Sequence, residues 1–220
     1  KDGVGLDWPI RYKDIKGWYD HVENFIGVSG NKDNLPQIPD GNFLPPWSMN
    51  CIEKHIKSKI ANHYSDRVLT IGRTTNLTKP HGGRGNCMAR NLCVRGCPYG
   101  AYFSSNSVTL PAAQKTNNMT LRPNSIVYTI LFDKNTKKAT GVRVVDEITK
   151  ETIEFKSKIV FLCASTLGST SILLNSVKNS FVDGLGNTSG QLGHNLMDNH
   201  FQVGAYGKYE GYENKYYRGR

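Results

Sequence analysis

The chain has 220 residues, 38% of them hydrophobic and 10% aromatic, so it can bury one sizeable core and is not a disordered protein. Its formal net charge is +10, but the 28 basic residues are scattered and do not alternate with aromatic ones, which argues against a nucleic-acid partner. The longest apolar run, 159–164, is too short to cross a membrane.

The first part of the chain is predicted to be helical and irregular. Apolar side chains recur at intervals of three and four between residues 12 and 26, and the cluster Gly27–Gly30 follows, which predicts an amphipathic helix that ends at the glycine. Residues 31–48 hold four prolines and predict an irregular surface segment. A second helix is expected over 48–64.

Residues 76–105 are rich in glycine and cysteine and fit neither a helix nor a strand. Three of the five cysteines, Cys87, Cys93 and Cys97, lie within eleven residues. An odd number of cysteines argues against a simple disulfide framework, and thiolates grouped in a short loop are what an iron–sulfur cluster needs. They would hold a three-iron cluster, or a four-iron one with an outside ligand.

Two other interpretations of these cysteines stay open. A zinc site would need a fourth ligand, for which His81 is the nearest candidate. Alternatively, the three side chains are buried free thiols, or one disulfide with a spare thiol.

From residue 120 onward the pattern is typical of β-structure. Three short strands joined by tight turns are predicted over 125–132, 141–145 and 152–158, which together make a β-meander. The run 159–164 predicts a strand buried on both faces, with Cys163 as a buried thiol. Small residues and a helical pattern follow, which completes a βα unit. Its helix N-terminus can face a phosphate or a flavin, or it is a plain turn of an α/β protein.

Taken in order, these motifs resemble the glucose-methanol-choline (GMC) oxidoreductases over nearly the whole chain. The motifs are the strand ending Cys163-Ala164-Ser165 with the stretch Ile172–Ser176, the segment Gly193–His200, and the run Gly5–Ile15 before Trp18-Tyr19. The cysteine run, followed by Pro98-Tyr99-Gly100-Ala101, is similar to the bacterial sugar-dehydrogenase branch of glucoside 3-dehydrogenases and of glucose and fructose dehydrogenase catalytic subunits. Some of its members bind an iron–sulfur cluster through a similar run.

The resemblance implies a mixed α/β chain that contains part of an FAD-binding GMC fold. It divides the chain into a helical, proline-rich segment (1–75), a cysteine- and glycine-rich region (76–119), the β-meander and βα unit of the FAD domain (120–180), and the start of a substrate domain (181–220).

The chemistry that the resemblance implies is oxidation of a sugar or alcohol hydroxyl by hydride transfer to FAD. Electrons would then pass to an acceptor other than oxygen, such as a small subunit or a cytochrome. The residues expected at the cofactor are Val127, through its backbone at the adenine; Ala164, Ser165 and Gly168 beside the flavin; and Asn195 and Asp198 near the isoalloxazine. Cys87, Cys93 and Cys97 are the expected metal ligands.

Features that the family has and this chain lacks predict an internal piece of a longer enzyme. No G-x-G-x-x-G motif follows a strand, and no histidine matches the family's C-terminal catalytic histidine. His194 and His200 are better explained as surface or core residues, so no catalytic residue is assigned and the chain alone is expected to be inactive.

The alternatives to an oxidoreductase are a stand-alone iron–sulfur electron-transfer protein and an interaction domain without a cofactor. The location in the cell is unknown from these residues, and the resemblance favours the periplasm over the cytoplasm, because relatives of this branch are often exported.

Overall fold

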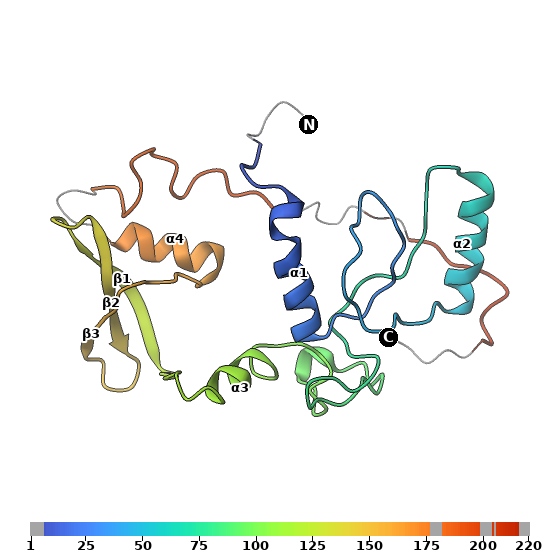
Figure 1. Ribbon diagram of the computed structural model, residues 1–220, viewed down its shortest axis with the longest axis horizontal. Coiled ribbons are helices and arrows are strands. Elements are labelled where there is room, and N and C mark those ends of the chain that lie inside the picture. Colours follow the sequence, from blue (N-terminus) through green and yellow to red (C-terminus); the bar gives the residue numbers. More distant parts are fainter. Residues whose placement is uncertain (1–6, 177–181, 199–203, 205, 216–220) are drawn as a thin grey trace. The chain divides into compact units, whose positions relative to one another are not determined.

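The computed structural model describes residues 7–176, 182–198, 204 and 206–215 (Figure 1). Among these, residues 7–119 with 206–215 form one compact unit, and the described residues between 120 and 204 form a second. The first unit contains helices joined by long irregular segments, and the second contains the sheet. The predicted mixed α/β class is therefore confirmed.

Helix α1 spans Tyr12–Ile26, as its apolar spacing predicts. The carboxylate of Asp14 accepts a hydrogen bond from the backbone N–H of Arg11 at 2.8 Å, which closes the first turn. The helix ends at Gly27, whose φ of +78° is left-handed, and a Cβ at this position would overlap the side chain of Leu77. Gly27 therefore ends α1, and its lack of a side chain lets Leu77 of the cysteine region pack against the end of this helix.

The buried residue Ser29 joins the segment after α1 to the chain that leads into the cysteine region. Its backbone N–H donates to the carbonyl of Thr74 at 2.8 Å, and the N–H of Thr74 donates back to Ser29 at 3.0 Å. The Ser29 hydroxyl donates to the carbonyl of Asn76, also at 3.0 Å. These bonds fix the entrance to the cysteine region against the start of the chain.

The second predicted helix forms as α2, Cys51–His63. A capping box at its start explains the boundary: the Asn50 side chain accepts from the N–H of Glu53 at 2.8 Å, and the Glu53 carboxylate accepts from the N–H of Asn50 at 2.7 Å. Two short elements follow in this unit, the 3₁₀ helix η1 (Cys93–Arg95) and helix α3 (Thr109–Gln114).

The second unit is built on the predicted β-meander (Figure 1). Strands β1 (Ser125–Asp133), β2 (Lys138–Asp146) and β3 (Thr152–Lys156) pair antiparallel in the order β1-β2-β3. Helix α4 (Ser165–Asn175) packs against β1. The buried apolar side chains of this unit include those of Ile130, Leu131, Val144 and Ile172.

The apolar run 159–164 differs from its prediction as a buried strand. It forms irregular chain in which Ile159 is 68% and Phe161 82% exposed, and the thiol of Cys163, expected to be buried, is exposed as well. Among the described residues the sheet consists of β1, β2 and β3 alone, so this run has no neighbouring strand to pair with and no second layer to cover its side chains. The helix that was predicted after it does form, as α4.

No helix in the described part of the chain is both long enough and apolar enough to span a bilayer.

Candidate functional site

The three clustered cysteines line one pocket. The backbone N–H of Cys87 donates to the carbonyl of Leu77 at 2.8 Å. Cys93 is the first residue of η1, and Cys97 lies two residues after the end of that helix. The pocket that they share has a volume of about 20 Å³ and is also lined by Arg90 and Asn76. The three cysteines thus line one pocket, and their role as metal ligands stays a prediction.

Several residues with positive φ make the loop turn back on itself. Ala89 and Asn91 are left-handed at φ +52° and +57°, and Gly96 has φ +96°. Beneath the loop, Leu77 and Ala101 are fully buried, and the N–H of Leu77 donates to the carbonyl of Ala101 at 3.0 Å. The thiols are therefore presented by a strained loop that rests on a small apolar base.

Each of the three sulfur atoms has a nitrogen donor. The backbone N–H of Ala89 lies 3.4 Å from the sulfur of Cys87, and the side-chain amide of Asn76 lies 3.7 Å from that of Cys93. Cys97 accepts from three backbone N–H groups, those of Tyr99, Ala101 and Tyr102.

The environment of Cys97 favours its thiolate. Burial alone raises the pKa of this thiol, but the three backbone N–H groups and the charge of Arg90 outweigh burial, so the pKa lies below its ordinary value. Cys97 is therefore the cysteine of this pocket whose environment is built for negative charge.

The loop as it stands does not form a metal centre. Within the described residues, no group of three or more cysteine, histidine or carboxylate side chains is gathered closely enough to hold a metal ion. A cavity of about 20 Å³ has room for roughly one water molecule. All five cysteines are free thiols, so the disulfide alternative is also not formed.

His81, the fourth ligand that a zinc site would need, is engaged elsewhere. Its Nε2 lies 2.6 Å from the carbonyl oxygen of Asn24, and the residue does not line the pocket of the three cysteines. The zinc alternative therefore loses its proposed ligand.

Cys87 and Cys93 also border a second, wider cavity. Its volume is about 340 Å³, and Trp47 and Arg73 contribute to its wall. Asn76, whose amide donates to Cys93, lines both cavities, as do Cys87 and Cys93.

The predicted flavin turn lies at the N-terminus of α4. Ala164 occupies the N-cap position and Ser165 is left-handed at φ +62°, and in the described chain no side chain caps this end. A Cβ added to Gly168 would lie 3.3 Å from the Cβ of Ala164, so these two residues approach closely. Uncapped backbone N–H groups at a helix N-terminus are donors for phosphate or carbonyl oxygens, which fits a flavin cofactor.

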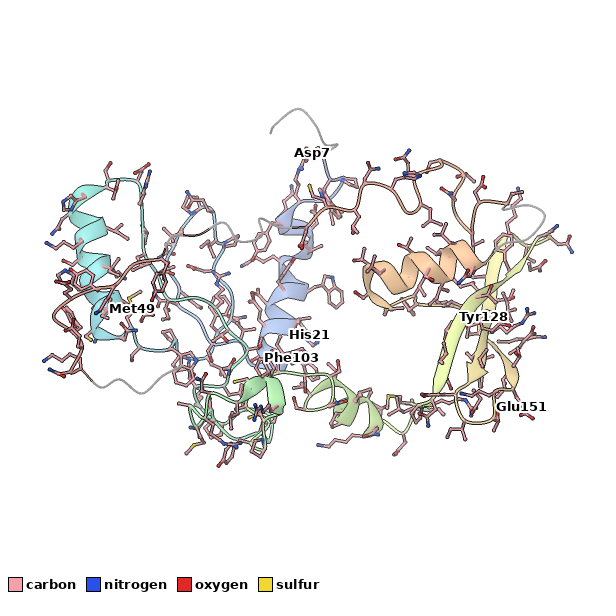
Figure 2. The ribbon with its side chains drawn as sticks, turned by 180° about the vertical axis from the view of Figure 1, so that it is seen from behind. Asp7, His21, Met49, Phe103, Tyr128 and Glu151 are labelled. Carbon is pink, nitrogen blue, oxygen red and sulfur yellow. The ribbon has the colours of Figure 1, made fainter. Side chains whose placement is uncertain are left out.

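Val127, predicted to contact the adenine by its backbone, lies beside a β-bulge. Val127 pairs with Val144, whereas the next paired residue is Thr129 opposite Arg143, so Tyr128 is an extra residue in β1 (Figure 2). Bulges re-aim the chain and interrupt the ladder, often next to binding sites. The adenine contact itself stays a prediction.

Asn195 and Asp198 follow a segment that lies against α4. A Cβ on Gly193 would be 3.9 Å from Thr170 and 3.8 Å from Leu174, both on that helix. Both predicted residues are exposed, and the Asn195 amide donates to the side-chain oxygen of Gln191 at 2.8 Å. Their role at the isoalloxazine stays a prediction.

Three residues that sequence reasoning did not select take part in these sites: Asn76, Arg90 and Ser176. Asn76 and Arg90 contact the cysteine pocket from outside the cysteine pattern, and no spacing motif marks either of them. Ser176 belongs to the stretch Ile172–Ser176, but its contact is with a strand 46 residues earlier, which periodicity does not reveal.

Known proteins match this chain along most of its length. The family model described as GMC oxidoreductase matches residues 67–201, more than half of the chain. The 2-methyl-1,2-propanediol dehydrogenase of Mycolicibacterium austroafricanum is 29% identical over 90% of the chain. The fructose dehydrogenase large subunit of Gluconobacter japonicus is 25% identical and the paromamine 6'-oxidase of Streptomyces fradiae 27% identical, each over 89% of the chain. These matches cover 35%, 36% and 35% of the relatives, so the chain spans about a third of their length.

Proposed function

The chain belongs to the GMC oxidoreductase family, and we propose that it forms part of an FAD-dependent enzyme that oxidises the hydroxyl-bearing carbon of a sugar or another alcohol. Bound FAD supplies the hydride acceptor for such a reaction. The names of the relatives support this class of substrate, since one is named for a propanediol and another for fructose.

The open N-terminus of α4 is the observation that carries the proposal on this chain. Its first-turn N–H groups have no side-chain cap among the described residues, and no acidic residue lies in that turn to compete for them. Ala164, Ser165 and Gly168 have short or no side chains, so at these positions a cofactor would meet the backbone directly. In the intact site these N–H groups would hold the electron-rich oxygens of the cofactor, and the short side chains would exclude water from beneath it.

For the electron acceptor, we propose a protein rather than oxygen, such as a further subunit or a cytochrome. Two of the three relatives named above are dehydrogenases and one of these is a large subunit, which supports an enzyme that works with other subunits.

FAD binding by the intact enzyme that contains this chain, freed of its bound FAD, tests the cofactor site. We expect saturable quenching of flavin fluorescence on titration, and at least about tenfold weaker binding by Gly168→Val, because a branched side chain fills the turn against Ala164. Gly17→Ala is the matched control, since Gly17 also lies within a helix and has open space around its Cβ position. Equal FAD affinity in Gly168→Val and Gly17→Ala would contradict the proposal.

Substrate oxidation is tested on the native flavoprotein purified from its source. Under anaerobic conditions, fructose and 2-methyl-1,2-propanediol are added separately, and the visible flavin absorption band is followed. Loss of the band with one of these polyols supports the activity. A band that neither they nor a panel of other alcohols bleaches would argue against it.

An iron–sulfur cluster on Cys87, Cys93 and Cys97 is a second proposal. It is supported by their common pocket and by the backbone donors around Cys97, but the present cavity is too small, so loading would require the loop to open. Anaerobic incubation with iron and sulfide should yield about three irons per chain and a broad visible absorption. A colourless protein with three titratable thiols in this loop would refute the cluster.

A further inference from the structure

One carboxylate oxygen near the end of α1 is buried without a hydrogen-bond partner. It is Oε2 of Glu23, which has no donor among the residues that the structure describes. The carboxylate accepts one hydrogen bond, from the backbone N–H of Asn42. Folded proteins leave few buried acceptors without a donor, because such an acceptor has lost its bonds to water. A donor from outside the fold would therefore be favourable at this oxygen.

The chain around this oxygen is held in place by the fold. A Cβ at Gly41 would overlap Oε2 of Glu23, so a glycine at this position lets the carboxylate reach the backbone. Three residues later, the backbone N–H of Leu44 donates to the carbonyl of Val28 at 2.8 Å, and the N–H of Gly30 donates to the carbonyl of Leu44 at 3.1 Å. The segment that surrounds the carboxylate is therefore bonded to the chain that leaves α1.

Glu23 lines a pocket that also has a basic side chain in its wall. The pocket has a volume of about 140 Å³, and its other lining residues include Asn24, Lys32, Asn42 and Phe43. Lys32 forms no ion pair with Glu23 or with any other carboxylate in the part of the chain that the structure describes. One acidic and one basic side chain therefore border the same space without neutralising each other.

The charges around Glu23 do not fully stabilise its ionised form. Burial raises the pKa of this carboxyl, and the negative charge of Asp20 acts in the same direction, whereas Arg73 and the N–H of Asn42 lower the pKa. Burial prevails, so the pKa lies above its ordinary value. A ligand that brings a positive charge to Oε2 would supply the stabilisation that the fold itself lacks.

The size and the charges of the pocket limit the kind of ligand. A protein cavity of about 150 Å³ holds a molecule of about six non-hydrogen atoms, such as benzene, and a hexose has about twice as many. A cation alone would be repelled by Lys32, and an anion alone by Glu23. Among the described residues, no three cysteine, histidine or carboxylate side chains are gathered to hold a metal ion. The pocket therefore suits a small molecule that carries both charges.

We propose that the pocket between Glu23 and Lys32 binds a small zwitterion, an α-amino acid of the size of alanine. The ammonium group of the ligand would donate to Oε2 of Glu23, and its carboxylate would accept from the ammonium group of Lys32. The ring of Phe43 provides an apolar part of the wall for the methyl group. This site is separate from the proposed oxidation of a hydroxyl and involves neither FAD nor the cysteines.

Calorimetric titration of the intact enzyme that contains this chain tests the proposal. The probes are L-alanine, ethylamine, which lacks the carboxylate, and propionate, which lacks the ammonium group. We expect L-alanine to bind, and each of the other two to bind at least about tenfold more weakly, because each leaves one charged side chain of the pocket without a partner. Equal affinity for ethylamine would make this a site for amines alone and would overturn the proposal.

Variants of the two charged residues locate the site. Glu23→Gln and Lys32→Gln should each weaken binding of L-alanine at least about tenfold. Glu151→Gln and Lys134→Gln make the same changes of charge at exposed positions next to strands of the sheet, and they should leave the affinity unchanged. Circular dichroism spectra that match the unchanged enzyme show that each variant is folded. Equal losses in the pocket variants and in these controls would place the binding elsewhere and overturn the proposal.

Water is the other occupant that could satisfy Oε2, and the same titration decides between the two. A polar pocket of this size has room for about four water molecules, which would also supply a donor. If L-alanine does not bind at all, the pocket holds water only and the proposal is wrong. Because FAD takes no part in these measurements, a failure of flavin binding at α4 and a failure of amino-acid binding at Glu23 are separate results.

Discussion

The hydroxyl of Ser176 accepts a hydrogen bond from the backbone N–H of Ile130 at 2.8 Å and donates one to the carbonyl of Ile172 at 2.6 Å. Ser176 is 5% exposed and Ile130 8% exposed, so both groups are removed from water. One side chain thus closes the end of α4 and fixes it to β1 just after the bulge at Tyr128. The position of the candidate flavin turn, at the other end of α4, depends on this attachment.

Replacing Ser176 by alanine is therefore expected to destabilise the second unit. The buried N–H of Ile130 would lose its acceptor, which costs about 1–3 kcal/mol of unfolding free energy. Urea unfolding followed by circular dichroism measures the change. Ser125→Ala removes a half-buried hydroxyl from the same strand, whose hydrogen bond to the carbonyl of Pro123 is exposed; it is the control and should change stability by less than about 0.5 kcal/mol. Similar losses in both variants would contradict the assigned role of Ser176.

Gly27→Ala is expected to destabilise the first unit. Alanine is strained at φ +78°, and its Cβ would overlap Leu77 beneath the cysteine loop, so the loss should be about 2–4 kcal/mol. Gly17→Ala, within α1 and in open space, should instead stabilise by about 0.5–1 kcal/mol. Thermal unfolding of both variants decides the matter, and a neutral Gly27→Ala would show that α1 does not end against the cysteine region as described.

Alkylation of Cys97 should begin at lower pH than is ordinary for a cysteine. The three backbone N–H groups and Arg90 lower its pKa, so its thiolate is present at a pH where an unperturbed thiol is still protonated. Peptide mapping after short exposure to iodoacetamide, over a series of pH values, gives the profile. In Arg90→Gln the profile should move to higher pH, whereas in Arg95→Gln, outside the pocket, it should stay in place. An unchanged profile in Arg90→Gln would refute the contribution of this charge.

Glu23 should make the stability of the first unit depend on pH. Burial raises the pKa of this carboxyl, against the opposing charge of Arg73, and one of its oxygens is buried with no hydrogen-bond partner in the described structure. A raised pKa means that the protonated form is favoured on folding. The contribution of Glu23 is therefore complete below the pKa of the unfolded chain and is lost as pH rises through the folded value.

Glu23→Gln consequently should stabilise the protein at pH 7, by about 1 kcal/mol, and should have little effect at pH 4. Glu151→Gln, at an exposed position after β2 (Figure 2), is the control and should be neutral at both pH values. Thermal melts at the two pH values provide the comparison. A larger gain at pH 4 than at pH 7 would reverse the sign of the argument.

Local patterns in the sequence were sufficient to predict the helices and the sheet. The apolar spacing of α1, the polar start of α2 and the alternation of β1 to β3 are properties of neighbouring residues, and each element forms close to its predicted bounds. The prediction of a strand over 159–164 was wrong because a strand needs a partner strand to pair with, and a local sequence pattern does not show whether one is present.

The candidate sites could be predicted only in part from the sequence. The grouping of the cysteines suggested a common location, but an extended run of this length can span roughly 35 Å, so it is the turns of the loop that bring the three residues to one pocket. The donors around them, such as Asn76 and Arg90, depend on the fold of the loop, which includes a left-handed turn at Ala89 that its residue type does not indicate. The bond between Ser176 and Ile130 likewise arises only once α4 has packed on the sheet.

The exposed run 159–164 has a consequence for how this chain behaves at high concentration. Its six residues combine β-branched and aromatic side chains with no charge and no proline, which is the composition of segments that stack into cross-β assemblies. Charged residues lie close to only one end of this run in the sequence. Lys156 and Lys158 precede it, whereas the first charged residue after it is Lys178. Self-association through this segment is therefore expected at high concentration, and replacing Phe161 by lysine should reduce it.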